Sequence, residues 1–193
     1  IRKVSFTGST DVGSGVMRGA ADRVAPVTLE LGGKSPLVVF PDADLDKVVQ
    51  AVADGIFYST GEICDAFSRA LVHESIAEEF TERFVETAES YVLGDPLDEA
   101  TTMGPLTSQR QFETVTEYIE TGKSEAELLC GGGTPDDPEL ADGWYVEPTV
   151  FGGVRNEMTV GSEEIFGPVQ TIQTFADYVE AIDYVTNIVG EDA

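Results

Sequence analysis

The chain is poor in basic residues, and this shortage is its strongest compositional feature. Its 193 residues include 11 lysines and arginines against 36 aspartates and glutamates, for a formal net charge of −25 at pH 7. A polyanion of this strength repels nucleic-acid phosphates and anionic membranes, so we expect neither as a partner. On an otherwise ordinary globular composition, the excess of acids favours a halophilic source, whose salt screens the repulsion, over a merely acidic mesophilic protein.

Cysteine, histidine and long apolar runs are also scarce. The two cysteines, Cys64 and Cys130, lie in unrelated settings, so we expect no disulfide, and two thiols alone form no zinc site, so we predict no metal. The single histidine, His73, ends the apolar string RALVH and is interpreted as structural. No apolar run reaches membrane-spanning length and no signal peptide precedes the first strand-like segment, so we expect a cytoplasmic protein.

Predicted strands and helices alternate along the chain. The hydrophobic periodicity predicts strands near residues 4–6, 27–31, 37–40, 69–73, 128–130, 144–150 and 169–175. It predicts helices near residues 11–21, 108–121 and 177–187. It predicts a further helix that begins after Asp44 as N-cap and runs through residue 56, and another that follows a capping box of Ser75 and Glu78. The alternation predicts an α/β fold with a mostly parallel sheet and flanking helices.

A glycine-containing turn joins the first predicted strand to the first helix. Residues 8–13 (GSTDVG) present backbone N–H groups and a helix N-terminus, which suit a phosphate. The turn is not G-x-G-x-x-G, and glycines at such junctions also serve packing alone. The turn alone does not distinguish phosphate binding from a packing role of its glycines.

Two side chains are candidates for covalent chemistry. Glu30 stands between leucines at a strand end, where it either caps nearby N–H groups or acts as a base. Cys64 follows Gly61 on a segment that we predict to be the first turn of a helix, whose dipole would favour the thiolate. The alternative is a small core residue, which is the interpretation given to Cys130.

Longer motifs carry a family resemblance. FTGST, LELGGKSP, GEIC, GWYVEPTV and EEIFGPV follow one another in an order and spacing similar to those of the NAD(P)-dependent aldehyde dehydrogenase superfamily. The resemblance covers essentially the whole chain and extends to betaine-aldehyde-type members. It implies oxidation of an aldehyde to the carboxylic acid with NAD or NADP, and a homo-oligomer at full length.

The resemblance also implies site roles. Cys64 would be the nucleophile that forms a thiohemiacetal, and Glu30 the general base that activates water to hydrolyse the thioester. Glu30 also favours release of a free acid over transfer to coenzyme A. Ser9 would meet the cofactor pyrophosphate, and Glu164 would hold the nicotinamide ribose with Phe166 beside it. The other implied cofactor-binding residues are Gly8, Gly13 and Leu31.

The chain departs from the family pattern beside Cys64. Glu62 replaces the usual glutamine, and Asp65 stands where a small or hydroxylated residue is usual. Two carboxylates next to the thiol disfavour the thiolate. They would alternatively attract a cationic substrate such as betaine aldehyde, to which Phe67 would add a cation–π face.

The resemblance further implies a partial chain. Residues 1–30 would be the C-terminal remnant of a dinucleotide-binding domain, and residues 31–193 most of a truncated catalytic domain. The oxyanion asparagine and the adenosine-binding strands of the family would lie outside it. An alternative of another class is therefore a catalytically inactive truncated product or an assembly partner of an intact paralogue.

Overall fold

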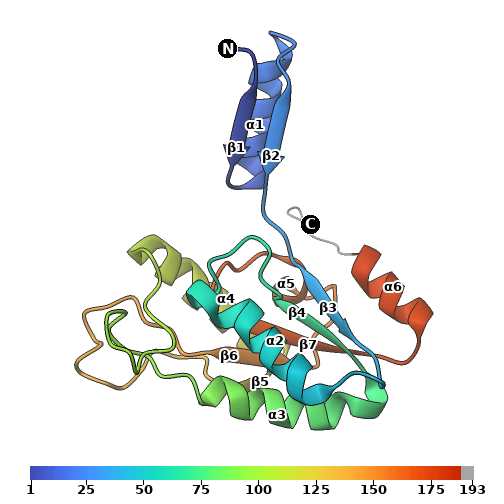
Figure 1. The fold of residues 1–193 in the computed structure, drawn as a ribbon, viewed down its shortest axis with the longest axis vertical. Helices are drawn as coiled ribbons and strands as arrows, with labels where there is room; N and C mark the ends of the chain where they lie inside the picture. The colour runs from blue at the N-terminus through green and yellow to red at the C-terminus, as the bar shows by residue number, and fades with distance from the viewer. Residues whose placement is uncertain (188–193) are drawn as a thin grey trace.

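Two separate sheets organise residues 1–187, the part of the chain that the computed structural model describes. The predicted catalytic range of residues 31–193 therefore ends in a segment, 188–193, that lies outside the described residues. Figure 1 shows a small unit of β1, α1 and β2 standing apart from a larger body. One connection, which leads from β2 to β3, joins the two parts.

The small unit is a strand–helix–strand motif. β1 (Val4–Thr7) pairs in parallel with β2 (Val27–Glu30), and α1 (Thr10–Ala21) connects them. The register sets Thr7 opposite Glu30, so both strands end at the same edge. Because the carboxyl ends of parallel strands meet there, the turn after β1 lies beside the residues that follow β2.

The larger body contains a five-stranded sheet in the order β3-β4-β7-β6-β5. β3 (Pro36–Val39), β4 (Arg69–His73), β7 (Val169–Phe175) and β6 (Thr149–Gly152) run parallel to one another. β5 (Glu127–Cys130) is antiparallel to β6 and closes one edge. The predicted α/β class with a mostly parallel sheet is confirmed.

Helices cover both faces of this sheet. α2 (Leu45–Phe57) and α3 (Ala77–Glu89) form one core with β4 residues Ala70 and Val72. Leu71, between them, points to the other face and packs near α6 (Tyr178–Thr186). A further core is built by α4 (Gln109–Glu125) and α5 (Thr159–Ser162). None of the helices within residues 1–187 combines the length and the apolar character needed to cross a bilayer.

One prediction about a helix start is wrong, and another is confirmed without the expected side-chain bond. The Ser75–Glu78 capping box is absent, because a 3-10 turn at Glu74–Ile76 precedes α3 and the Ser75 N–H donates to His73 Nδ1 at 3.2 Å. Asp44 flanks α2 as predicted, but its carboxylate makes no capping bond and instead pairs with Lys47 at 2.7 Å. His73 ends β4 and stacks edge-on against Phe175, as expected of a structural residue.

The predicted strand at residues 144–150 is also too long. β6 begins at Thr149, just after Pro148, which has no N–H to offer a neighbouring strand. The Trp144 carbonyl instead accepts a hydrogen bond from the Leu106 N–H at 2.9 Å. The helix α5 was not predicted, because four residues provide too short a periodic signal.

The charge imbalance predicts a dependence on salt. Ion pairs such as Lys47–Asp44, Arg83–Glu79 and Lys123–Glu120 lie on the exposed surface, where each contributes little. Most of the 36 acids have no basic residue to pair with, since the chain has 11. We therefore expect unfolding or aggregation in dilute buffer and recovery in molar KCl, which screens the repulsion. Thermal unfolding followed by circular dichroism measures this, and equal stability at both salt concentrations would contradict the halophile interpretation.

Candidate active site

A cleft of about 500 Å³ collects almost all of the predicted site residues. Its walls come from the turn after β1, the segment after β2, the GEIC segment, the first turn of α4 and the EEIF segment. The lining residues are Thr7, Gly8, Ser9, Glu30, Leu31, Gly32, Glu62, Ile63, Cys64, Gln111, Glu164 and Phe166. Of the predicted site residues, Gly13 alone is absent from this lining.

The parallel pairing of β1 and β2 builds one wall. The Gly8 N–H donates to the Glu30 carbonyl at 3.0 Å, which continues the ladder one residue past the strands. Ser9 is the N-cap of α1, and its hydroxyl accepts a hydrogen bond from the Val12 N–H at 3.5 Å. The N-terminus of a three-turn helix therefore opens at the cleft, where its dipole and free N–H groups favour an anion.

Gly13 has a different place. It is buried in α1, and a Cβ at this position would lie 2.5 Å from Cδ2 of Leu31. The glycine therefore lets α1 pack closely on Leu31, which does line the cleft. Its predicted contact with a cofactor stays a prediction, and the structure gives it a packing role.

Cys64 lies in an exposed turn and not on a helix. A 3-10 turn at Tyr58–Gly61 follows α2, and it contains Ser59 and Thr60 at φ of 48° and 57°. These left-handed residues end the helical path, so the predicted support of the thiolate by a helix dipole is wrong. Cys130, by contrast, is buried, and burial raises the pKa of its thiol to about 11.

Glu62 is held at the side of the cleft. Its carboxylate accepts hydrogen bonds from the Thr107 N–H at 3.0 Å and from the Thr107 hydroxyl at 2.7 Å. The negative charge of Glu62 is therefore partly stabilised by Thr107, in the segment that leads into α4. Asp65, on the other side of Cys64, is exposed.

The EEIF segment forms the opposite wall. A Cβ on Gly32 would lie 2.1 Å from Oε2 of Glu164, so that carboxylate sits directly against the backbone after β2. Phe166 is 37% exposed and has φ of 57°, a conformation that costs free energy for a bulky residue. Gln111 Nε2 holds this turn by donating to the carbonyls of Ile165 at 3.1 Å and Phe166 at 2.8 Å.

Sequence reasoning missed Gln111. Its side chain acts on residues that lie more than fifty positions later in the chain, and no local pattern marks such a contact. The single local signal is its place in the first turn of α4, where its N–H donates to Ser108 Oγ at 3.2 Å.

Two basic side chains outside the lining of the cleft are buried. Arg69 is 0% exposed, and its guanidinium donates to the Lys34 carbonyl at 2.9 Å, to Asn156 Oδ1 at 3.3 Å and to the Tyr184 carbonyl at 3.2 Å. Burial lowers the pKa of Arg69 to about 10. Lys34 is 4% exposed; burial and the Arg69 charge lower its pKa to about 7, against the pull of Glu164 and Glu163.

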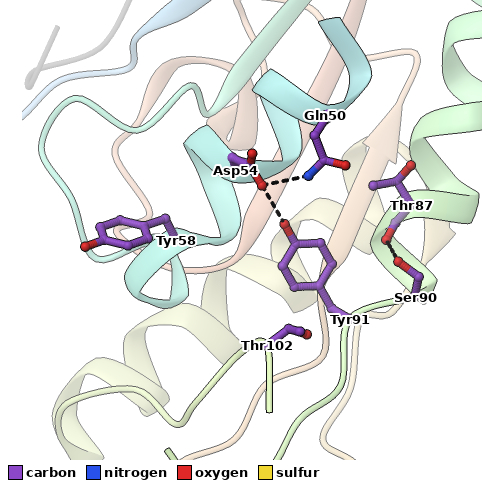
Figure 2. Close-up of a pocket in the computed structure, with 7 residues that line it drawn as sticks. All are labelled: Gln50, Asp54, Tyr58, Thr87, Ser90, Tyr91 and Thr102. Carbon is purple, nitrogen blue, oxygen red and sulfur yellow. Dashed lines mark hydrogen bonds between the residues drawn. The ribbon is translucent and has the colours of Figure 1, made fainter. Parts of the chain in front are cut away.

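A second pocket, of about 420 Å³, is a surface feature of α2 and α3 (Figure 2). Asp54 accepts hydrogen bonds there from Gln50 Nε2 at 2.7 Å and from the Tyr91 hydroxyl at 3.5 Å. Burial and this carboxylate raise the pKa of Tyr91 to about 12. Its polar groups are largely bonded to one another, and it contains none of the predicted site residues. Within residues 1–187, no cluster of three or more His, Cys, Asp or Glu side chains has metal-binding geometry.

An exposed thiol and a carboxylate thus share a cleft with a helix N-terminus and a second carboxylate. The aldehyde dehydrogenase family model matches residues 1–188, and the chain belongs to that family. This confirms the family predicted from the sequence motifs.

Similar proteins include several betaine aldehyde dehydrogenases. The chloroplastic protein of Amaranthus hypochondriacus is 50% identical over 184 residues, which are 95% of this chain and 36% of that protein. The protein of Brucella anthropi is 47% identical over 181 residues, 93% of this chain and 37% of its own length. The chain thus spans little more than a third of the length of these relatives.

Solved structures agree with this likeness. The betaine aldehyde dehydrogenase of Staphylococcus aureus in complex with NAD+ superposes with a TM-score of 0.94 at 36% identity, over 97% of this chain and 37% of that one. An aldehyde dehydrogenase of Bacillus cereus superposes with a TM-score of 0.92 at 42% identity, over 97% of this chain and 38% of that one. Both confirm the aldehyde-dehydrogenase-like fold.

Proposed function

We propose that the protein oxidises an aldehyde to the carboxylic acid with NAD+ or NADP+. The observation that carries the proposal is the shared cleft, in which the exposed Cys64 and the Glu30 carboxylate lie with Ser9 and Glu164. Family membership and the NAD+ complex of the Staphylococcus aureus relative support it.

The side chains divide the chemistry between them. The Cys64 sulfur adds to the aldehyde carbon and forms a thiohemiacetal, whose oxyanion the Cys64 N–H stabilises. NAD(P)+, when bound, would accept the hydride that leaves the carbon of this adduct as the thioester forms. Glu30 then removes a proton from water, which attacks the thioester carbonyl, so that the acid leaves and the thiol is restored.

The described residues fit part of the cofactor. Because Gly32 has no side chain, the Glu164 carboxylate occupies the space that a Cβ at position 32 would fill. A carboxylate at this place suits the hydroxyls of the nicotinamide ribose. The N-terminus of α1, capped by Ser9, suits the pyrophosphate. We assign residues 1–30 to a dinucleotide-binding domain and the residues after them to a catalytic domain, an assignment that the two separate sheets support.

The test of this function is alkylation of the two cysteines with and without NAD+, together with NADH production from an aldehyde. We expect Cys64 to react quickly, with a rate that NAD+ changes, because it is exposed in the cleft. Cys130 should react only after unfolding. If native Cys64 reacted no faster than Cys130 in the unfolded chain and no NADH formed, the inactive alternative would hold.

We further propose betaine aldehyde as substrate. The relatives carry its name, and the carboxylates of Glu62 and Asp65 flank the thiol with negative charge. A trimethylammonium group near such charges is attracted to them. The same resemblance leads us to propose a homo-oligomer in the cytoplasm, where salt would screen the acidic surface.

The substrate proposal predicts a change in preference. Replacing both acids (Glu62→Gln with Asp65→Ser) should lower the kcat/KM ratio of betaine aldehyde to 3,3-dimethylbutanal, its neutral counterpart of similar shape, by roughly three- to tenfold. The remote exposed pair Glu139→Gln with Asp142→Ser is the matched control and should leave the ratio unchanged. An unchanged ratio in the cleft variant would exclude a role of these charges in substrate choice.

A further inference from the structure

A buried amine without a hydrogen bond follows two residues after Gly32, which lines the cleft. Lys34 is 4% exposed, and its Nζ has no hydrogen-bond partner within residues 1–187. The backbone at this position is fixed, because the Lys34 carbonyl accepts a hydrogen bond from Arg69 Nε at 2.9 Å. An amine that is buried without a partner is costly, which makes Lys34 a candidate for a role beyond packing.

Three charged groups act on this amine. Arg69, on β4, repels its positive charge, while Glu163 and Glu164, both after α5, attract it. The Glu163 carboxylate already accepts a hydrogen bond from the Tyr118 hydroxyl at 2.8 Å. Glu164 is the carboxylate that lines the cleft.

The segment that carries Lys34 also touches both halves of the site. A Cβ on Gly32 would overlap the Glu164 carboxylate, and a Cβ on Gly33 would lie 3.6 Å from the Cys64 carbonyl. The backbone of residues 32–34 therefore contacts the cofactor side and the thiol side of the cleft. Lys34 follows directly on this backbone, and Glu164 attracts its positive charge.

We propose that Lys34 is a positioning residue whose ammonium, through its charge and without a direct hydrogen bond, favours the place of the Glu164 carboxylate against Gly32, in the orientation that binds the nicotinamide ribose. This inference rests on the proposed function. Lys34 touches no reacting atom and acts through Glu164.

The proposal has a pH dependence with a definite sign. Because burial and Arg69 lower the pKa of Lys34 to about 7, the ammonium is present below neutral pH and is lost as the pH rises through 7. Arg69, with a pKa near 10, stays charged throughout this range. NAD+ should therefore bind more tightly at pH 6 than at pH 8.5, by roughly three- to tenfold, because the attraction between the ammonium and the Glu164 carboxylate is lost.

The test measures NAD+ affinity by calorimetry between pH 6 and pH 8.5 in the full protein. In Lys34→Met, a change of similar volume without charge, affinity should be weak at pH 6 and nearly independent of pH. The matched control is Lys47→Met, which removes a lysine with an 83% exposed side chain and should keep the wild-type profile. Binding with the wild-type pH profile in Lys34→Met would overturn the inference alone. Absence of NAD+ binding by the wild type at every pH would overturn the proposed function and the inference with it.

If Lys34→Met does not fold, a second measurement tests whether Lys34 and Glu164 are electrostatically coupled. The chain has four lysines, so the ¹⁵Nζ signal of Lys34 can be followed by NMR through a titration. Glu164→Gln should move the midpoint of that signal to lower pH, because it removes the charge that attracts the proton. An unchanged midpoint would show that the two groups are not coupled and would overturn the inference without any reference to cofactor or activity.

Discussion

Cys64→Ala is expected to reduce aldehyde oxidation by at least about 10³-fold, because Cys130, the other thiol within residues 1–187, is buried and cannot form the adduct that the reaction requires. NADH formation at saturating aldehyde measures the loss. Since Cys64 lies in an exposed turn, the substitution removes little packing, and the unfolding midpoint should change little.

Cys130→Ala is the matched control for this experiment. The residue is 8% exposed, its sulfur lies 3.9 Å from the Pro148 carbonyl, and it lines no part of the cleft. The turnover of the Cys130→Ala variant should stay within about twofold of wild type. Loss of the buried sulfur should lower the free energy of unfolding by about 1 kcal/mol. Equal activity in Cys64→Ala and wild type would exclude Cys64 as the nucleophile.

Glu30→Gln is expected to separate the two halves of the reaction. The amide keeps the shape of the carboxylate but cannot take a proton from water, so hydrolysis of the thioester should slow by about 10²- to 10⁴-fold. The first turnover should still release NADH as a burst, after which the acyl-enzyme accumulates. Stopped-flow absorbance measures the burst, and the intact mass reports the added acyl group.

The control for this carboxylate is Glu127→Gln, the same change at the exposed first residue of β5. It should leave both the burst and the steady state as in wild type. Loss of the burst together with the steady state in Glu30→Gln would mean that Glu30 acts before hydride transfer. Loss of neither would exclude it as the base.

The part of the site that follows from local pattern could be predicted from the sequence. The family resemblance assigned Gly8, Ser9 and Glu30 to one site, and the parallel pairing of β1 and β2, which end at one edge, accounts for their proximity. Cys64 was placed in the site by its motif, but its conformation was not predicted. The left-handed backbone extends from Gly61 back to Ser59 and Thr60, two residue types that rarely adopt it.

The remaining contacts depend on residues far apart in the chain. Gln111 reaches the Phe166 carbonyl, and Lys34 lies within the field of Glu164 and Arg69, although nothing in their own neighbours signals either arrangement. Lys34 stands within the LELGGKSP motif, and nothing in that motif predicts a buried lysine, since lysines are mostly exposed. Its burial is a product of the packing of β4 and the segment after β2.

The left-handed backbone at Phe166 lowers the stability of the fold, while its aromatic side chain forms part of the cleft. An aromatic residue at φ of 57° stores strain of about 1–3 kcal/mol, which the two hydrogen bonds from Gln111 help to hold in place. Glycine at this position would relax the backbone and raise the melting temperature while it removed an aromatic wall from the cleft. Laboratory evolution for heat resistance alone would therefore drift toward variants that are more robust and catalytically poorer, with position 166 among the first to change.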